Sequence, residues 1–227
     1  MTEPGRAESA AALAQCPRLA AGEPFDFVCA GCGDCRNRRD LVLSGYDLYR
    51  IARRLGLPPR LTADAFCKQE FAPQTLLPAV VLRPNARTGN CPFFEADACT
   101  IHAARPLACA LYPLGQAIDP ATAAMEYYVQ LPLCGARVSA QEQRTLQNYL
   151  DDAAITARAG IDARWAVVCT QLSDKLQQAG GRENPRYLPA ARRIARALYF
   201  DYSIQDDFYP QFNANTQALW PLLDKML

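Results

Sequence analysis

The first helical pattern in the chain follows a short apolar run. Residues 40–43 carry that run and predict a strand. Ser44 and Asp47 follow it and offer N-cap chemistry, and apolar residues then recur at helical spacing until Gly56. The pattern therefore predicts a strand that leads into a capped amphipathic helix.

The middle of the chain changes from a helical to a strand-like pattern. A second helix is predicted over 62–72, and the spacing of its apolar residues puts Cys67 in the core. The short β-branched run 76–83 predicts a strand, and 114–118 with 125–131 predict a hairpin. Because such strands are short and separated by turn residues, they favour small sheets.

The pattern becomes mainly helical after about residue 137. Ser139 and Glu142 have the spacing of a capping box, which predicts a helix that continues to Gly160. A further helix begins near Asp162, and its apolar face includes Cys169. We therefore interpret Cys169, like Cys67, as a core residue.

Two more helices complete the predicted C-terminal part. Residues 188–202 form a basic amphipathic helix, and 215–227 form a last helix interrupted or kinked at Pro221. The basic helix carries only Arg192, Arg193 and Arg196, which is too few for a nucleic-acid footprint. We interpret these arginines as a solvated face.

These elements predict an α+β protein with a small cysteine-rich metal-binding core of short strands and helices and an α-helical C-terminal extension. We expect an N-terminal arm at 1–24 and a cysteine-cluster domain at 25–137. A helical region at 138–227 is expected to pack on that domain. The 227 residues are 50% hydrophobic, so a buried core is feasible.

Composition and charge indicate which binding partners and which cellular compartment to expect. The 24 basic and 23 acidic residues nearly balance, so no global charge attracts nucleic acid or an anionic membrane. No apolar run is long enough to span a bilayer, and the N-terminus lacks an export-signal pattern. We therefore expect a cytoplasmic protein, whose ten cysteines are not a disulfide framework because the cytosol keeps thiols reduced.

Seven of the ten cysteines form a cluster in the sequence beside glycine and proline. Three of them follow one another at i, i+3 spacing, which allows the sulfurs to reach one centre, but three thiolates do not complete a zinc or cubane site. His102 is the single histidine, so any site must be mainly thiolate, which selects zinc, copper(I) or iron–sulfur over magnesium, calcium or manganese. The candidate ligands are Cys29, Cys32, Cys35, Cys91, Cys99, Cys109 and Cys134.

Several enzyme classes lack their motifs in this chain. It has no Walker phosphate loop, no H-E-x-x-H zinc site, and no glycine-rich dinucleotide or methyltransferase loop. The C-x2-C-x2-C spacing also differs from the C-x3-C-x2-C spacing of radical S-adenosylmethionine enzymes. A Cys–His catalytic pair would need Cys99 or Cys109 beside His102.

The cysteine segments resemble the YkgJ-type cysteine-cluster family, described as zinc- or iron-chelating domains. The resemblance covers roughly residues 25–137, and its most specific part is C-x-I-[YH]-x-x-R-P-x-x-C. The chain departs from the family pattern at Arg36, where a second adjacent cysteine is usual, and at His102, which is often tyrosine. We treat His102 as a second-shell or packing residue. The matching segments read CAGCGDC, CPFF, CTIHAARPLACALYP and CG.

The resemblance also implies functions. The family includes flagellin lysine N-methylases, which implies an iron–sulfur cluster, most simply [4Fe–4S], with S-adenosylmethionine and methyl transfer to a protein lysine. The leading hypothesis is a metal-binding protein that holds an iron–sulfur cluster or zinc. Its alternatives are that cluster-dependent methyltransferase and a zinc-stapled structural or interaction module.

Arg105 is a candidate cofactor-binding residue or a plain surface ion pair. The expected partners are a metal ion or cluster and a protein partner or substrate, with no nucleic acid and no membrane.

Overall fold

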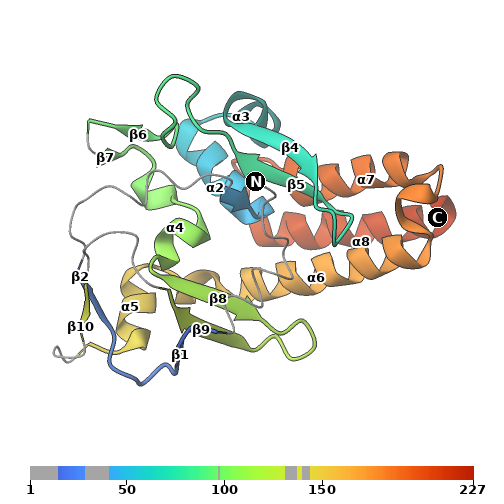
Figure 1. The fold of residues 1–227 in the computed structure, drawn as a ribbon. Coiled ribbons are helices and arrows are strands. Elements are labelled where there is room, and N and C mark those ends of the chain that lie inside the picture. Colours follow the sequence, from blue (N-terminus) through green and yellow to red (C-terminus); the bar gives the residue numbers. More distant parts are fainter. Residues whose placement is uncertain (1–14, 29–40, 97, 131–136, 140–143) are drawn as a thin grey trace. The chain divides into compact units, whose positions relative to one another are not determined.

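The computed structural model describes residues 15–28, 41–96, 98–130, 137–139 and 144–227 (Figure 1). These residues form helices and short antiparallel strands, which confirms the α+β prediction. The chain divides into two compact units. The first unit consists of Met1–Arg38 and Leu107–Ala166, and the second of Arg39–Pro106 and Val167–Leu227. The expected domain boundaries at residues 24 and 137 stay a prediction.

Two small antiparallel sheets belong to the first unit. The predicted hairpin is confirmed as β8 (Leu114–Ile118) and β9 (Met125–Val129), and β1 (Arg18–Leu19) adds a third strand beside β9. The second sheet pairs β2 (Asp26–Val28) with β10 (Arg137–Ser139). In this ladder Val28 lies opposite Arg137, so the chain leaves β2 at the end where it enters β10.

The helix after β10 is capped at a different residue from the predicted one. Ser139 is the last residue of β10, and Glu142 lies outside the described residues. The helix α5 (Leu146–Asp152) instead has Thr145 as its N-cap, and Asn148 returns the capping bond to the Thr145 backbone. The predicted cap was wrong because two similar signals stand six residues apart, and sequence spacing does not decide between them.

The prediction that this helix continues to Gly160 is also wrong. Ala154 adopts a left-handed backbone conformation with φ 56°, which ends α5. The short 3-10 helix η3 (Thr156–Arg158) then leads into α6 (Ala159–Gln178), and Gly160 lies inside α6. The further helix predicted near Asp162 is confirmed as α6.

The first unit has an apolar core in which β2, α4 (Leu107–Leu111) and α5 take part. Phe25 and Tyr149 meet edge to face with their ring centroids 5.0 Å apart. The Tyr149 hydroxyl also donates a hydrogen bond of 2.7 Å to the Tyr112 carbonyl, directly after α4. The buried members of this core are Phe25, Ala110, Leu111, Leu114, Leu146, Leu150 and Ile155.

A buried ion pair stabilises the start of α6. Arg158 donates from Nε and Nη2 to the two carboxylate oxygens of Asp162, at 2.7 and 2.8 Å. Their side chains are only 3% and 5% exposed. At such burial the bidentate geometry must offset the large cost of removing both charges from water.

The predicted strand before Ser44 belongs to a three-stranded sheet in the second unit. It is β3 (Leu41–Leu43), which pairs with β5 (Pro78–Leu82), and β5 pairs in turn with β4 (Cys67–Phe71). The strand predicted over 76–83 is thereby confirmed. The helix predicted over 62–72 is wrong, because α3 (Pro59–Phe66) starts earlier and ends where β4 begins. Residues 67–71 gain five pairings with β5 as a strand, so sheet formation overrides the apolar spacing.

The capped helix predicted after Ser44 is confirmed as α2 (Gly45–Leu55). The Ser44 hydroxyl accepts from the Asp47 amide at 3.1 Å, and the Asp47 carboxylate accepts from the Ser44 amide. Gly56 ends the helix in the left-handed conformation, with φ 68°. This helix therefore has both of the end signals that the sequence predicted.

The remaining helices of the second unit agree in part with the helices that the sequence predicted. The basic segment forms α7 (Tyr187–Ala195) and continues into the π-helix η5 (Arg196–Phe200), with its three arginines exposed as predicted. The last helix α8 (Phe208–Met226) begins seven residues before 215 and contains Pro221. Figure 1 shows α7 and α8 beside each other in this unit. None of the helices in the described parts of the chain is long and apolar enough to cross a membrane.

The Arg158–Asp162 pair gives a stability prediction. Asp162→Ala removes the carboxylate that faces a buried guanidinium, and we expect the free energy of unfolding to fall by about 3 kcal/mol. Urea denaturation followed by circular dichroism measures this loss. The double variant Arg158→Met with Asp162→Leu replaces both charges with apolar groups and should recover most of it. Equal losses in the single and double variants would contradict a role for the ion pair.

Candidate metal centre

The structure describes three of the seven cysteines proposed as ligands. Cys91 and Cys99 belong to the second unit and Cys109 belongs to the first. Cys91 and Cys99 are partly exposed, and Cys109 is exposed. The other four candidates, Cys29, Cys32, Cys35 and Cys134, lie outside the described residues.

Cys91 and Cys99 lie at the same end of a small hairpin. The hairpin pairs β6 (Phe94–Glu95) with β7 (Ala98–Cys99), and Cys99 lies directly opposite Phe94. The Phe94 amide donates to the Cys91 carbonyl at 3.2 Å, which closes a turn between these two residues. Both cysteines are thus at the open end of the hairpin, away from the turn that joins its strands.

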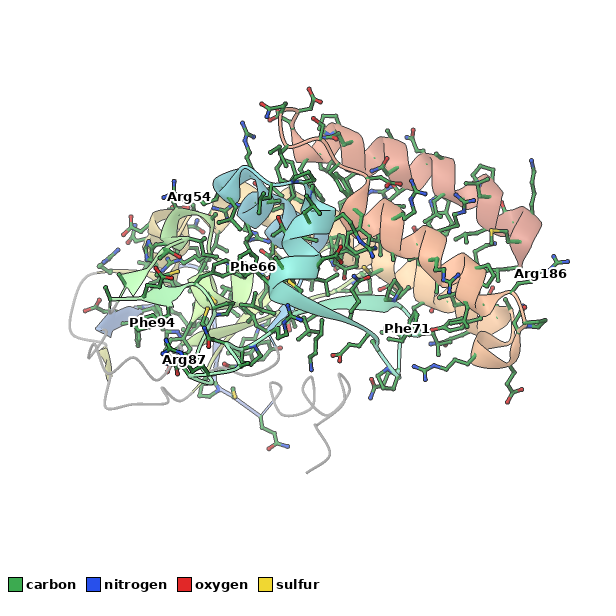
Figure 2. All side chains as sticks on the ribbon, turned by 90° about the horizontal axis from the view of Figure 1, so that it is seen from above. Arg54, Phe66, Phe71, Arg87, Phe94 and Arg186 are labelled. Carbon is green, nitrogen blue, oxygen red and sulfur yellow. The ribbon has the colours of Figure 1, made fainter. Side chains whose placement is uncertain are left out.

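Phe93 anchors this hairpin to the second unit. Its side chain is 3% exposed, and its ring centroid lies 4.8 Å from that of Phe66 at the end of α3. The amide and the hydroxyl of Thr100 both donate to the Phe93 carbonyl, at 2.9 and 3.1 Å. Figure 2 labels Phe66 together with Phe94, the hairpin residue next to the anchor. The cysteines on either side of Phe93 are therefore held by an apolar contact that does not involve sulfur.

A short 3-10 helix, η2 (His102–Ala104), follows Cys99. Ile101 and Ala104 are buried, which fixes η2 on the second unit. Arg50 of α2 donates from Nη2 to the Ala103 carbonyl at 2.5 Å. This bond ties the segment after Cys99 to the capped helix.

His102 and Arg105 meet on the outside of η2. Arg105 Nη1 lies 3.1 Å from His102 Nε2. Because a guanidinium can only donate, His102 Nε2 is the acceptor in this contact. The exposed ring thereby holds the Arg105 side chain, the candidate cofactor-binding group, in a defined position.

Cys109 lies on the exposed side of α4. Its neighbours Ala110 and Leu111 are buried in the core of the first unit, so the helix keeps its apolar residues inside and its thiol outside. The rings of Tyr112 and Phe27 meet edge to face at 5.8 Å. This contact links the end of α4 to β2, the strand that precedes Cys29.

Two other cysteines are core residues, as the sequence predicted. Cys67 and Cys169 are 6% and 8% exposed. Burial raises the pKa of the Cys67 thiol from 9.0 to about 12, and the charge of Arg83 lowers it by a smaller amount. A thiol with this pKa is protonated at neutral pH and is a poor metal ligand.

The thiols of the three described cluster cysteines are chemically suitable ligands for zinc or iron. Within the described ranges, no group of three or more His, Cys, Asp or Glu side chains gathers in a way that could hold a metal ion. The three described cluster thiols are exposed to solvent at least in part, unlike the core thiols. Thiolates are the ligands that zinc and iron–sulfur clusters take.

Arg50 and Phe93 are positioning residues that carried no signal in the sequence. Arg50 lies on a helix with several arginines, and nothing in its spacing points to a carbonyl 53 residues away. Phe93 stands beside Phe94 in the sequence, but only Phe93 is buried. A one-residue difference in exposure within a short loop depends on tertiary packing.

Comparison with known proteins connects these cysteines to a family. A family model named CxxCxxCC, described as a putative zinc- or iron-chelating domain, matches residues 28–135. A search of curated proteins and a search of solved structures gave no match. The matched segment contains all seven cysteines of the cluster.

The bond from Arg50 to Ala103 gives a prediction on local stability. Arg50→Ala should speed hydrogen exchange of the Ala104 and Arg105 amides by about fivefold to tenfold, because their turn loses its tie to α2. Exchange measured by NMR reports this change. Arg54→Ala is the matched control, since Arg54 lies on the same helix and is exposed (Figure 2). Faster exchange throughout the second unit in both variants would contradict a local role.

The Cys67 pKa gives a prediction on pH dependence. The folded protein holds the thiol proton more tightly than the unfolded chain does, so this contribution to stability is present below about pH 9 and is lost toward about pH 12. The free energy of unfolding of the wild type should therefore fall more steeply above about pH 9 than that of Cys67→Ala. Urea titrations at increasing pH compare the two slopes. Parallel curves would show that the thiol does not ionise on unfolding.

Proposed function

We propose that the protein binds zinc or an iron–sulfur cluster through its clustered cysteines, because its residues 28–135 match the CxxCxxCC family of putative zinc- or iron-chelating domains. The family match is the observation that carries this proposal. Four or more of the thiolates act together, because both kinds of centre take four protein ligands in their complete form. The proposed ligands are Cys29, Cys32, Cys35, Cys91, Cys99, Cys109 and Cys134.

Chain connectivity supports the proposal in the first unit. Cys29 follows Val28 directly in the sequence, and Cys134 precedes Arg137 by three residues. Since Val28 and Arg137 are opposite each other in the ladder, the two cysteine segments attach to the same end of one small sheet.

The separation of core thiols from exposed thiols is a second support. A metal ligand must give up its proton, and Cys91, Cys99 and Cys109 are at least partly exposed to water. Cys67 illustrates the opposite case, because its burial raises the pKa to about 12. The three described candidate ligands thus lie outside the core, and the other described thiols, apart from the partly exposed Cys16, lie inside it.

Arg105 has a proposed role beside the metal. Its guanidinium lies in the segment between Cys99 and Cys109 and is oriented by His102. A cation in this place can donate hydrogen bonds to thiolate sulfur or to a bound anion. The metal itself would supply a charge centre, and in the iron–sulfur case a site for electron transfer.

Metal analysis tests the proposed function. The protein is purified without oxygen or chelator from cells supplied with iron, and zinc, iron and acid-labile sulfide are measured with the visible spectrum. Iron with sulfide and a brown chromophore identifies an iron–sulfur cluster, whereas a colourless protein with about one zinc identifies a thiolate zinc site. Protein that holds neither metal in a stoichiometric amount would contradict the proposal.

Cysteine variants then test which thiols bind. Cys32→Ser, Cys91→Ser and Cys109→Ser should lower the metal content and the melting temperature together, because metal binding contributes to folding stability. Cys67→Ala is the matched control, and it should lower the melting temperature through a core cavity while the metal content stays unchanged. A metal content that is unchanged in Cys91→Ser would remove Cys91 from the ligand set.

A further inference from the structure

A shallow depression in the second unit lies where α7 and η5 pack beside α8. Its volume is about 150 Å³. Four polar residues contribute to its lining, and they come from three consecutive parts of the C-terminal region: Arg193, Arg196, Asp201 and Asn215. None of the three described cluster cysteines lines it.

The polar side of the depression is built on the π-helical turn. The Asp201 amide donates to the Arg196 carbonyl at 3.0 Å, five residues back. Arg196 Nε donates to both carboxylate oxygens of Asp201, at 3.1 and 3.2 Å, and Asn215 Nδ2 donates to the Asp201 carbonyl at 2.8 Å. Wide turns of this kind are frequent at functional sites. The turn and α8 therefore hold Arg196 and Asp201 in place.

The lining carries an excess of positive charge. It contains two guanidinium groups and one carboxylate, and that carboxylate already receives Arg196 Nε. Within the described parts of the chain, the side chain of Arg193 makes no hydrogen bond or ion pair. Arg193 and the two terminal nitrogens of Arg196 thus keep donors that an anion can use.

The rest of the lining is apolar. It is formed by Ala197, Ala218, Leu219 and Leu222. Leu222 is 46% exposed, although it is a large hydrophobic residue on a well-packed helix. An apolar wall next to two guanidinium groups suits a ligand that has both an anionic and an apolar part.

We propose that this depression binds a small organic carboxylate that carries a short apolar group. The carboxylate lies at Arg193 and Arg196, whose forked donors match its two oxygens, and the apolar group lies against Ala218 and Leu222. The volume of about 150 Å³ suits a small ligand. The proposal does not depend on the proposed metal function.

Titration of the full-length protein with benzoate tests the site. The NMR signals of the arginine Nε–H groups report on the guanidinium groups directly. We expect saturable shifts for Arg193 and Arg196 with a dissociation constant of roughly 1 mM. Acetate lacks the apolar group and benzyl alcohol lacks the charge, so each should bind at least about threefold more weakly.

Two arginine variants distinguish specific binding at this site from unspecific attraction to positive charge. Arg193→Gln should weaken benzoate binding about threefold to fivefold. Arg192→Gln is the matched control, because Arg192 is the exposed neighbour on α7 and does not line the depression. Leu222→Asn should weaken benzoate binding without changing acetate binding, and melting curves confirm that each variant is folded.

Three results would overturn the proposal. The first is the absence of saturable shifts with benzoate. The second is an equal loss of binding in the Arg192 and Arg193 variants, which would indicate unspecific attraction. The third is binding of inorganic phosphate as tight as that of benzoate, which would show an anion site without a role for the apolar wall.

Discussion

The packing of Phe25 and Tyr149 is the contact on which the cysteine-bearing elements of the first unit depend. β2 has three residues and α4 has five, and elements this short are not stable alone. Phe25 places the start of β2 in the apolar core, and its amide donates to the Arg144 carbonyl at 2.9 Å. Tyr149 then joins this core to the end of α4 through its bond to the Tyr112 carbonyl. The segments that lead to Cys29 and carry Cys109 therefore take their positions from apolar packing.

The second unit meets the same requirement with a different set of contacts. Its hairpin has only two residues in each strand, so the Phe93–Phe66 contact and the Thr100 bonds fix its place. Arg50 fixes the next segment from a helix whose two ends are both capped. In both units the elements next to the described cysteines are thus held by groups other than sulfur, and a metal would add to an existing arrangement.

The sequence predicted the elements whose signals are local. Ser44, Asp47 and Gly56 define α2 through side-chain and backbone chemistry within a few residues, and the structure agrees. Residues 67–71 were predicted incorrectly because their strand conformation depends on pairing with β5, ten or so residues along the chain. The N-cap of α5 was misassigned because Ser139 pairs with Asp26, a partner 113 positions earlier in the sequence that spacing cannot reveal.

In the candidate site, too, local signals were predictable from the sequence and contacts between distant residues were not. Helical spacing in the sequence identified Cys169 as a buried thiol, in contrast to the thiols beside glycine and proline. Cys67 is buried as expected, but it lies in β4 and not in the predicted helix. The positioning by Arg50 and Phe93 was not predictable, because it depends on where distant elements meet. The depression beside η5 was also not predictable from the sequence. A π-helical turn has no simple sequence pattern, and the residues that line the depression come from α7, α8 and the η5 segment between them.

The two classes of thiol follow from one energetic condition. A metal ligand must lose its proton, and burial opposes this by removing water from the resulting thiolate, as the raised pKa of Cys67 illustrates. A chain that binds metal through cysteine is therefore best served by thiols at turns and at the ends of short elements, where water remains until the metal replaces it. Cys91, Cys99 and Cys109 meet this condition in the described structure. Stability without metal then has to come from the aromatic and aliphatic core, and this is the role that Phe25, Tyr149 and Phe93 have here.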